Sequence, residues 1–136
     1  MENLNVKVQW CDKNFACVWG NPEFGVVAVT NKTFEGLKKE FELSLKAQIN
    51  DMVADGEYVP EWLVNGDYMI NYEMHISAVL RMAERFTTMA AISRVTGINQ
   101  RLLTHYASSI KEPRKEQREK IISGLHCIGN SFLAMQ

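Results

Sequence analysis

Arginine is missing from the first 74 residues of this 136-residue chain, and aspartate is missing from the rest. Residues 1–74 carry six lysines against twelve acidic side chains, a formal charge of −6. Residues 75–136 carry nine basic side chains against four glutamates, a formal charge of +5. A basic, arginine-rich segment favours polyanions such as nucleic acids, and an acidic segment does not. We therefore expect two domains, 1–74 and 75–136, with different partners.

Long apolar runs are also absent, since no stretch approaches the roughly 18 residues of a membrane-spanning helix, and the first residues lack the pattern of a signal peptide. The three cysteines form no Cys-x-x-Cys pair, which favours reduced thiols over disulfides or a zinc site. The sequence contains no phosphate-binding glycine-rich loop, His-Glu-x-x-His helix or Gly-x-Ser-x-Gly motif. We expect a cytoplasmic protein with no cofactor and no metal, and not an enzyme.

Three strands are predicted at the start of the chain. Apolar and polar side chains alternate over residues 6–10 and again over 15–19, on either side of the break Asp12-Lys13-Asn14, which predicts a hairpin. After a Pro- and Gly-containing turn, the apolar run at residues 26–29 is typical of a more buried strand.

A long helix and a further strand complete this domain. Apolar side chains recur at steps of three and four from Phe34 to Met52, with Thr33 placed to cap the helix and Gly56 just beyond its end. Residues 62–74, with the turn-forming pair Asn65-Gly66, are interpreted as strand. The order β-β-β-α-β predicts an α+β domain.

Two carboxylates in this domain, Asp12 and Glu73, raise the alternative of a metal-dependent nuclease. Such an enzyme holds two divalent ions about 4 Å apart between several converging carboxylates. Asp12 lies at a predicted turn and Glu73 near the end of a predicted strand, and neither has an evident set of partners. A domain without an active site is the favoured interpretation.

Residues 75–136 carry the pattern of an all-helical domain. Apolar spacing predicts a helix from Ile76 to about Arg85 and a second from Thr88 to Thr96, with Thr87 as its N-cap and Phe86 as the apolar residue before the cap. Gly97 is placed to end the second helix in a left-handed conformation.

Asn99 is placed to cap a third helix with two distinct faces. Leu102, Leu103 and Tyr106 would point inward together with Ile98. The outward face would carry Gln100, Arg101, Thr104 and His105. A helix that reads DNA needs such a packed face and a polar tip, because glutamine pairs with adenine and arginine with guanine in the major groove. A plain helical hairpin with a solvated polar face would show the same pattern.

The run ISRVTGINQRLLTHYASSIKEP, residues 92–113, resembles the Cro and phage-repressor class of helix-turn-helix domains. The resemblance implies that Gln100, Arg101, Thr104 and His105 face bases, and it places five residues near phosphates: Arg94, Asn99, Ser108, Lys111 and Arg114. That class usually has glycine where Ser109 stands, so we expect a strained or differently shaped turn there. Of the predicted phosphate contacts, that of Lys111 depends most on the shape of this turn.

Residues 114–133 predict a last amphipathic helix, weakened by Gly124 and Gly129 because glycine costs about 1 kcal/mol relative to alanine in a helix interior. The apolar side of this helix would pack in the domain core or line a dimer interface, and core packing is the more common use of such a helix.

The segment VQWCDKNFACVWGNPEFGVVAVTNKTFEGLKKEFELSL, residues 8–45, resembles the HicB antitoxin domain, a partial ribonuclease-H-like fold. With the helix-turn-helix resemblance it covers nearly the whole chain. In that family the N-terminal domain masks HicA, a small messenger-RNA-cleaving toxin, and the C-terminal domain represses the operon as a dimer or higher oligomer.

The resemblance thus implies an antitoxin whose partners are operator DNA, a HicA-like toxin and a second copy of the chain. The aromatic side chains Trp10, Phe15, Trp19 and Phe24 could anchor a toxin, although aromatic residues on strands more often belong to the core. Two alternatives stay open: a solitary DNA-binding regulator without a toxin, and a ribonuclease-H-like nuclease.

Overall fold

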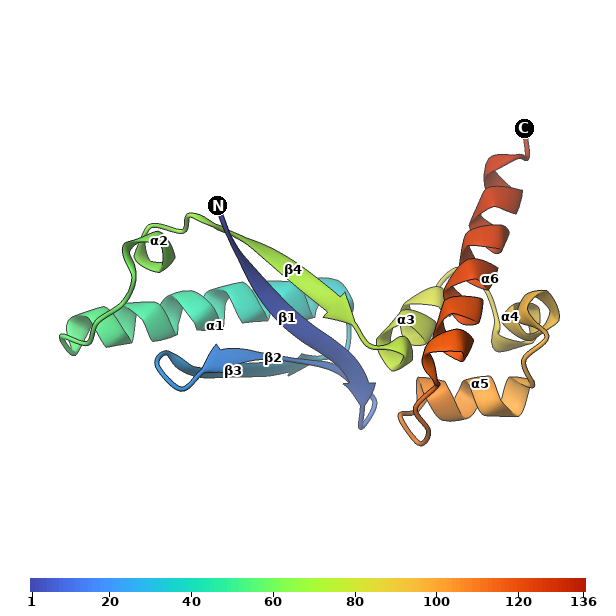
Figure 1. Ribbon diagram of the computed structural model, residues 1–136, viewed down its shortest axis with the longest axis horizontal. Helices are drawn as coiled ribbons and strands as arrows, with labels where there is room; N and C mark the ends of the chain where they lie inside the picture. The colour runs from blue at the N-terminus through green and yellow to red at the C-terminus, as the bar shows by residue number, and fades with distance from the viewer. The chain divides into compact units, whose positions relative to one another are not determined.

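The computed structural model describes the backbone of residues 1–136 and every side chain except that of Asn21. The chain divides into two compact units, Met1–His75 and Ile76–Gln136. The first unit contains a sheet with helices, and the second is helical (Figure 1). The chain is therefore an α+β protein, as the residue patterns predict. Within the described residues, no helix is both long enough and apolar enough to cross a membrane.

The first unit is built on a four-stranded mixed sheet of order β3-β2-β1-β4. The strands are β1 (Glu2–Cys11), β2 (Asn14–Asn21), β3 (Gly25–Asn31) and β4 (Tyr68–Met74). β1 pairs antiparallel with β2, and β2 antiparallel with β3, whereas β1 and β4 run parallel. Parallel neighbours need a long crossover, which the segment between β3 and β4 supplies.

The predicted first hairpin is confirmed at the break between β1 and β2. Asp12 and Lys13 form its two-residue loop and both have positive φ, 51° and 65°. These values are those of a type I′ turn, whose twist matches that of the flanking strands. The Asn14 side chain donates a hydrogen bond to the Asp12 carbonyl oxygen at 3.0 Å, which adds a local tie across the turn.

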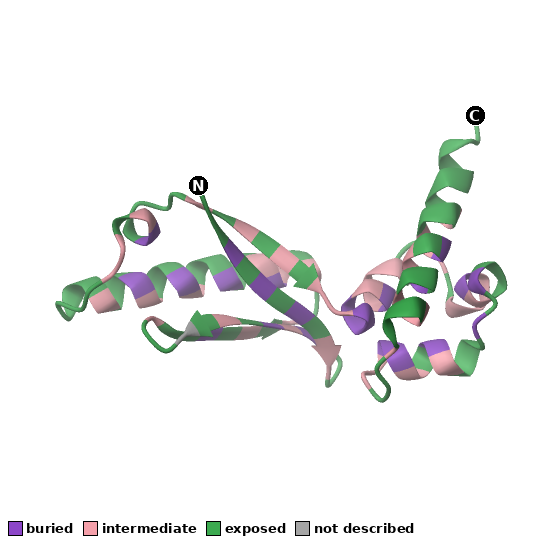
Figure 2. Ribbon diagram, viewed as in Figure 1, coloured by how far each residue is buried: buried purple, intermediate pink, exposed green. Residues whose placement is uncertain are grey.

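Helix α1 (Phe34–Ala54) covers one face of this sheet, and the core lies between them (Figures 1 and 2). The Thr33 hydroxyl accepts a hydrogen bond from the Gly36 N–H at 3.0 Å, and Gly56 follows the helix with a φ of 75°, so both predicted ends are confirmed. The helix and strands bury alternate or periodic apolar side chains: Leu4, Val6, Val8, Phe15, Cys17, Val27, Leu37, Phe41, Leu45 and Ile49.

The predicted strand at residues 62–64 is wrong, because Glu61–Val64 forms the short helix α2 and buries Leu63. Asn65-Gly66 ends this helix instead of turning a hairpin. Asn65 has a φ of −81°, whereas a type I′ turn requires positive φ at both central residues. Gly66 has a φ of 75°, and the Asp67 N–H donates to the Trp62 carbonyl oxygen at 2.8 Å, which closes the helix end.

The second unit contains α3 (Ile76–Ala83), α4 (Met89–Thr96), α5 (Gln100–Ala107) and α6 (Lys115–Leu133). Helix α4 contacts both α5 and α6, and α3 contacts α5. The buried core draws on all four helices and on the α4–α5 connection: Ile76, Leu80, Ile92, Ile98, Leu103, Tyr106, Ala107 and Ile121.

The predicted N-cap of the second helix is off by one residue. Thr88, not Thr87, has the extended cap conformation, and its hydroxyl accepts a hydrogen bond from the Ala91 N–H at 3.0 Å. The Thr87 N–H instead donates to the Ala83 carbonyl oxygen at 3.0 Å, so Thr87 still belongs to the last turn after α3. Phe86 is 74% exposed, which leaves a large apolar side chain on the surface.

Gly124 lets α6 approach the end of α4. A Cβ at this position would lie 2.5 Å from the Cγ2 atom of the buried Thr96, closer than real Cβ contacts allow. Thr96 is β-branched and makes two hydrogen bonds, so it has little freedom to move aside. Glycine lowers the stability of a helix interior, as the sequence predicts for Gly124. Close packing of α6 on α4 offsets this loss.

Candidate DNA-binding surface

Three residues, Gly97 to Asn99, connect α4 to α5 and set the direction of α5. Gly97 has a φ of 75°, a left-handed conformation that costs other residues about 1–2 kcal/mol. The Gly97 N–H donates to the Ser93 carbonyl oxygen at 2.8 Å and closes α4. Ile98, only 4% exposed, then fills the angle between the two helices. The predicted roles of Gly97 and Ile98 are confirmed.

Two hydroxyl groups tie this connection to α4. The Ser93 hydroxyl donates to the Ile98 carbonyl oxygen at 2.6 Å. The Thr96 hydroxyl donates to the Ile92 carbonyl oxygen at 2.7 Å and accepts from the Ile98 N–H at 3.2 Å. The backbone polar groups of Ile98 are thereby satisfied inside the unit. Sequence reasoning missed these ties, since a serine and a threonine in a helix carry no signal for this role.

Helix α5 has one buried and one exposed face. Leu103, Tyr106 and Ala107 are buried, which fixes the helix on the rest of the unit. Its N-cap is Asn99, whose side-chain oxygen accepts from the Arg101 N–H at 2.8 Å, as predicted. Of the four side chains predicted to face bases, Gln100, Arg101 and Thr104 are exposed and His105 is half-buried.

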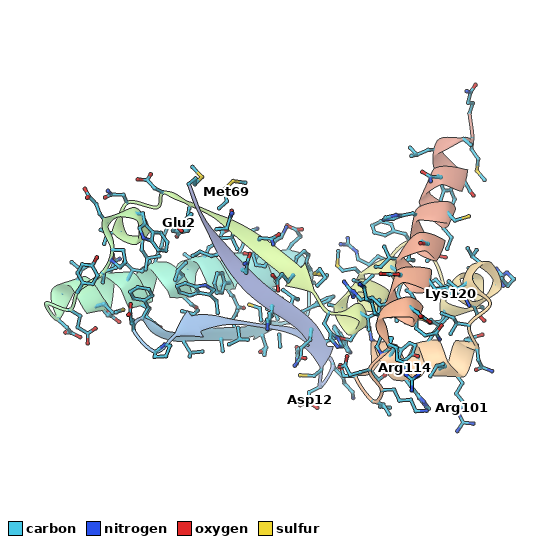
Figure 3. The ribbon with its side chains drawn as sticks, in the orientation of Figure 1. Glu2, Asp12, Met69, Arg101, Arg114 and Lys120 are labelled. Carbon is cyan, nitrogen blue, oxygen red and sulfur yellow. The ribbon has the colours of Figure 1, made fainter. Side chains whose placement is uncertain are left out.

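The side chains at the start of α5 differ in how freely they can reach a ligand. Arg101 extends away from the helix into solvent (Figure 3). The Thr104 hydroxyl donates to the Gln100 carbonyl oxygen at 3.0 Å, which leaves its oxygen lone pairs as acceptors. The helix N-terminus adds a partial positive charge at the same end. This end of α5 can therefore present donors and acceptors to an anionic or polar partner.

The residues predicted to lie near phosphates fall into two groups. Arg94, Lys111 and Arg114 are exposed cations, and Asn99 is exposed at the helix cap. Ser108 is half-buried, and its hydroxyl accepts a hydrogen bond from Arg81 at 2.9 Å. A hydroxyl that accepts a hydrogen bond can also donate one, so Ser108 can still contact a phosphate. Its bond with Arg81 also links α3 to the end of α5.

Arg81 is a positioning residue that sequence reasoning missed. Its Nε donates to the Ala107 carbonyl oxygen at 3.0 Å, so a cation on α3 binds the C-terminal end of α5. A second guanidinium nitrogen lies 3.3 Å from a Glu84 carboxylate oxygen. A cation near helix carbonyls is favourable because the C-terminal end carries a partial negative charge. The i,i+3 spacing of Arg81 and Glu84 was the available signal.

Ser109 adopts the left-handed conformation that its position demands, with a φ of 60°. The Ile110 N–H donates to the His105 carbonyl oxygen at 2.9 Å, and the Ser109 N–H to the Tyr106 carbonyl oxygen at 3.2 Å. This pair of hydrogen bonds is the Schellman ending of a helix, in which the left-handed residue is usually glycine. The shape of the turn is thus ordinary, and the strain is confined to Ser109.

We expect Ser109→Gly to raise the free energy of unfolding of the second unit by about 0.5–1 kcal/mol, because glycine removes the left-handed penalty. Gly97→Ala should lower it by about 1–2 kcal/mol, since no described heavy atom lies within 4 Å of the added Cβ and the cost is conformational alone. Urea denaturation of both variants measures the two changes. Destabilisation by Ser109→Gly would show that the Ser109 side chain contributes more than its backbone strain costs.

The first unit contains a cleft of about 790 Å³ at the β4 side of α1, lined by residues of α1, α2 and β4. Tyr72 lines it, and its hydroxyl is buried without a hydrogen-bond partner among the described atoms. Burial, with the Glu42 carboxylate nearby, raises the pKa of Tyr72 to about 12. Burial likewise raises the pKa of the Cys17 thiol to about 11, so this thiol is unreactive at neutral pH.

The two carboxylates considered for a nuclease lie apart. Asp12 is in the β1–β2 turn, whereas Glu73 pairs across the parallel strands with Lys7. Asp12 lies five residues beyond Lys7 along the chain, roughly 16 Å at the rise of a β-strand. Among the described side chains, no three of the His, Cys, Asp and Glu type group closely enough to hold a metal ion. Asp12 and Glu73 therefore cannot share one ion.

Comparison of the chain with protein-family models, with curated proteins and with solved structures found no match. The chain is an α+β protein in which the N-terminal end of α5 is polar and exposed, while the opposite face of α5 is buried against the second unit.

Proposed function

We propose that the protein binds double-stranded DNA through α5 and acts as a transcriptional repressor. The observation that carries this proposal is the exposed row Gln100, Arg101 and Thr104 at the N-terminal end of a helix whose opposite face is buried. The residues between α4 and α5 form a short, internally bonded connection of the kind that joins the helices of a helix-turn-helix.

The size and chemistry of α5 suit the major groove. A helix with its side chains is about 10–12 Å across, and the groove is about 12 Å wide. Gln100 can form two hydrogen bonds to adenine and Arg101 two to guanine, while Thr104 can contact either a base edge or a thymine methyl. His105, half-buried, lies at the edge of this set.

Phosphate contacts would come from the cations around α5. Arg94, Lys111 and Arg114 are exposed and belong to a unit with a formal charge of +5. Asn99 and Ser108 could add neutral donors. Contacts of this kind fix the position of the helix on the duplex and carry no sequence information themselves.

The proposal is tested by binding of the full chain to DNA from upstream of its own gene, compared with shuffled DNA of equal length, by fluorescence anisotropy. A specific complex should be about 10³-fold or more tighter than the complex with shuffled DNA. Equal affinity for both sequences would contradict sequence-specific repression.

Arg114→Ala should weaken binding to every DNA sequence by a similar factor and reduce the slope of log affinity against log salt by about 1, because one phosphate contact is lost. Lys120→Ala is the matched control, since it removes the same charge from α6, the helix that Arg114 precedes, without a proposed DNA contact. The same anisotropy titrations from low to moderate salt measure both slopes. An unchanged slope in Arg114→Ala would remove Arg114 from the interface.

We further propose that the first unit neutralises a HicA-type toxin, which makes the chain an antitoxin rather than an enzyme, acting in the cytoplasm. The resemblance of residues 8–45 to HicB supports this, as does the formal charge of −6, because an RNA-cleaving partner is expected to be basic. Co-expression with the neighbouring reading frame tests it. A small basic product that co-purifies and is toxic alone supports the antitoxin, whereas its absence leaves a solitary regulator.

A further inference from the structure

The face of the sheet under α1 is covered unevenly. Residues that pair across β1 and β4 point to the same face, and Leu4 pairs with Ile70 and Val6 with Tyr72. Leu4 and Val6 are buried, whereas Ile70 and Tyr72 are only half-buried. Figure 2 shows the difference as purple bands along β1 and pink bands along β4. Because α1 packs mainly against β3 and β2, its cover ends at β4 and leaves a cleft of about 790 Å³ beside that strand.

Strand β4 also lies at an edge of the sheet. It pairs with β1 on one side, and no described strand pairs with its other side. Backbone N–H and C=O groups of this outer edge are therefore open to a partner with peptide-like groups. The cleft volume lies within the roughly 300–1,000 Å³ of small-molecule sites. Strand and cleft together can offer backbone and side-chain contacts to one small ligand.

The Tyr72 hydroxyl is a buried polar group that lacks a partner. The ring of Tyr72 packs edge-on against those of Phe34 and Phe41, with centroids 5.7 Å and 6.2 Å away, so its position is fixed. No described atom makes a hydrogen bond with its hydroxyl oxygen. An unsatisfied buried hydroxyl lowers the stability of the fold. A ligand that enters between the flexible side chains of the cleft wall would supply the missing partner.

Two charged side chains of the cleft have no ion-pair partner. Lys38 is held by Glu35 at 3.0 Å and lies over the Phe34 ring. Glu42 and Lys46, by contrast, are exposed and make no ion pair with any described side chain. They lie one helix turn apart on α1, where Cβ atoms are about 5–6 Å apart. The cleft thus presents one carboxylate and one ammonium group a short distance from each other.

Apolar side chains from three elements line the same cleft. Ile49 comes from α1, Leu63 and Val64 come from α2, and Ile70 comes from β4. An apolar lining takes the hydrocarbon part of a ligand, while a few placed polar groups fix its orientation. A ligand that uses all of these groups must carry a positive group, a negative group and an apolar part.

We propose that this cleft binds a small zwitterion of the amino-acid type, a free amino acid or a dipeptide with an apolar side chain. The ligand ammonium group donates to Glu42, and the ligand carboxylate accepts from Lys46. The apolar side chain lies against Leu63 and Ile70, and the Tyr72 hydroxyl gains a hydrogen-bond partner. Hydrogen bonds between ionised groups are the stronger ones, so the two charged contacts set the selectivity. The site lies within the first unit and is independent of DNA binding by the second.

Isothermal titration calorimetry of the full chain tests the site with four probes. Two are zwitterions, L-leucine and leucyl-leucine, and the tighter of these identifies the source of the ligand. The other two are leucinamide, which lacks the carboxylate, and 4-methylpentanoate, which lacks the ammonium group. A zwitterion should bind at one site per chain with a dissociation constant of about 1 mM or below. Each truncated probe should bind roughly 10-fold more weakly or worse, because one charged contact is lost.

Two variants separate the two ends of the ligand. Glu42→Gln should weaken zwitterion binding about 10-fold or more and leave the weaker binding of 4-methylpentanoate unchanged, because that probe has no ammonium group. Lys46→Gln should weaken zwitterion binding in the same way and leave leucinamide unchanged. Lys39→Gln is the matched control, since Lys39 is an exposed cation of α1 outside the cleft, and it should bind like the wild type.

Tyr72→Phe removes the hydroxyl and keeps the ring against Phe34 and Phe41. Without ligand, the variant should unfold at the wild-type temperature or above, because the unsatisfied buried group is gone. Its dissociation constant for the zwitterion should rise about 3-fold to 10-fold, because one neutral hydrogen bond is lost. Differential scanning calorimetry and the same titrations measure the two changes. A lower unfolding temperature with unchanged binding would remove Tyr72 from the site.

The absence of saturable binding by both leucine and leucyl-leucine overturns the proposal. Binding that survives both Glu42→Gln and Lys46→Gln overturns it as well, because the ligand then lies elsewhere. Binding of 4-methylpentanoate as tight as that of leucine would show that the site takes a simple anion, which contradicts a zwitterion site. None of these titrations contains DNA, so failure of this site and failure of the proposed repressor are distinguishable.

Discussion

The double variant Gln100→Ala/Arg101→Ala should bind the operator about 30-fold to 10⁴-fold more weakly than the wild type. Each lost bidentate base contact costs about 1–3 kcal/mol, and each 1.4 kcal/mol is tenfold in affinity. Both side chains are exposed, so their truncation leaves the core of the unit intact. Binding to shuffled DNA should fall much less, because only the charge of Arg101 contributes there.

Fluorescence anisotropy with operator and shuffled duplexes at one salt concentration measures both affinities. The matched control is Lys39→Ala/Asn50→Ala in the first unit, which also removes one cation and one amide from exposed positions. The control should bind like the wild type. If the double variant retains wild-type operator affinity, α5 does not read bases, and the proposed function loses its central observation.

Leu103→Ala should lower the free energy of unfolding of the second unit by about 2–5 kcal/mol. Leu103 is 0% exposed and belongs to the core that joins α5 to the other helices. A unit of 61 residues has a total stability of only about 3–9 kcal/mol at the usual 0.05–0.15 kcal/mol per residue. The substitution should therefore unfold a large fraction of residues 76–136.

Amide resonances in a heteronuclear NMR spectrum measure this loss residue by residue. Those of Ile76–Gln136 should lose dispersion, whereas those of Met1–His75 should stay, because the first unit has its own core between the sheet and α1. Leu43→Ala, on an exposed side chain of α1, is the control and should change stability by less than about 0.5 kcal/mol. Unfolding of both units together would show that they are not independent.

The elements best predicted from sequence are those with several agreeing local signals. Helix α1 combines apolar periodicity with a threonine cap at Thr33 and a glycine end at Gly56, and its bounds are confirmed. The α4–α5 connection is similar, since glycine is the residue type that most readily adopts the left-handed conformation found at position 97, and asparagine at position 99 is a common helix cap. The exposed start of α5 could be predicted for the same reason.

The errors came from signals that fit two structures. Asn65-Gly66 is a strong hairpin pair, yet the same glycine also ends a helix, and the negative φ of Asn65 shows that the pair ends a helix here. Thr87 and Thr88 are equally good caps, and the hydrogen bond from Thr87 back to Ala83 selected the second. The i,i+3 spacing of Arg81 and Glu84 indicated only their ion pair. Nothing local indicated the bond from Arg81 to the Ala107 carbonyl, which lies 26 residues away.

The parallel pairing of β1 and β4 also affects how the protein is made. β1 ends at Cys11, but β4 begins only at Tyr68, so the ribosome must add 57 more residues before the strand has its second neighbour. At about 5–20 residues per second this takes roughly 3–12 s, during which one edge of β1 stays open. An open edge invites pairing with another chain. A nascent chain stalled between α1 and β4 should therefore be the form most prone to aggregate.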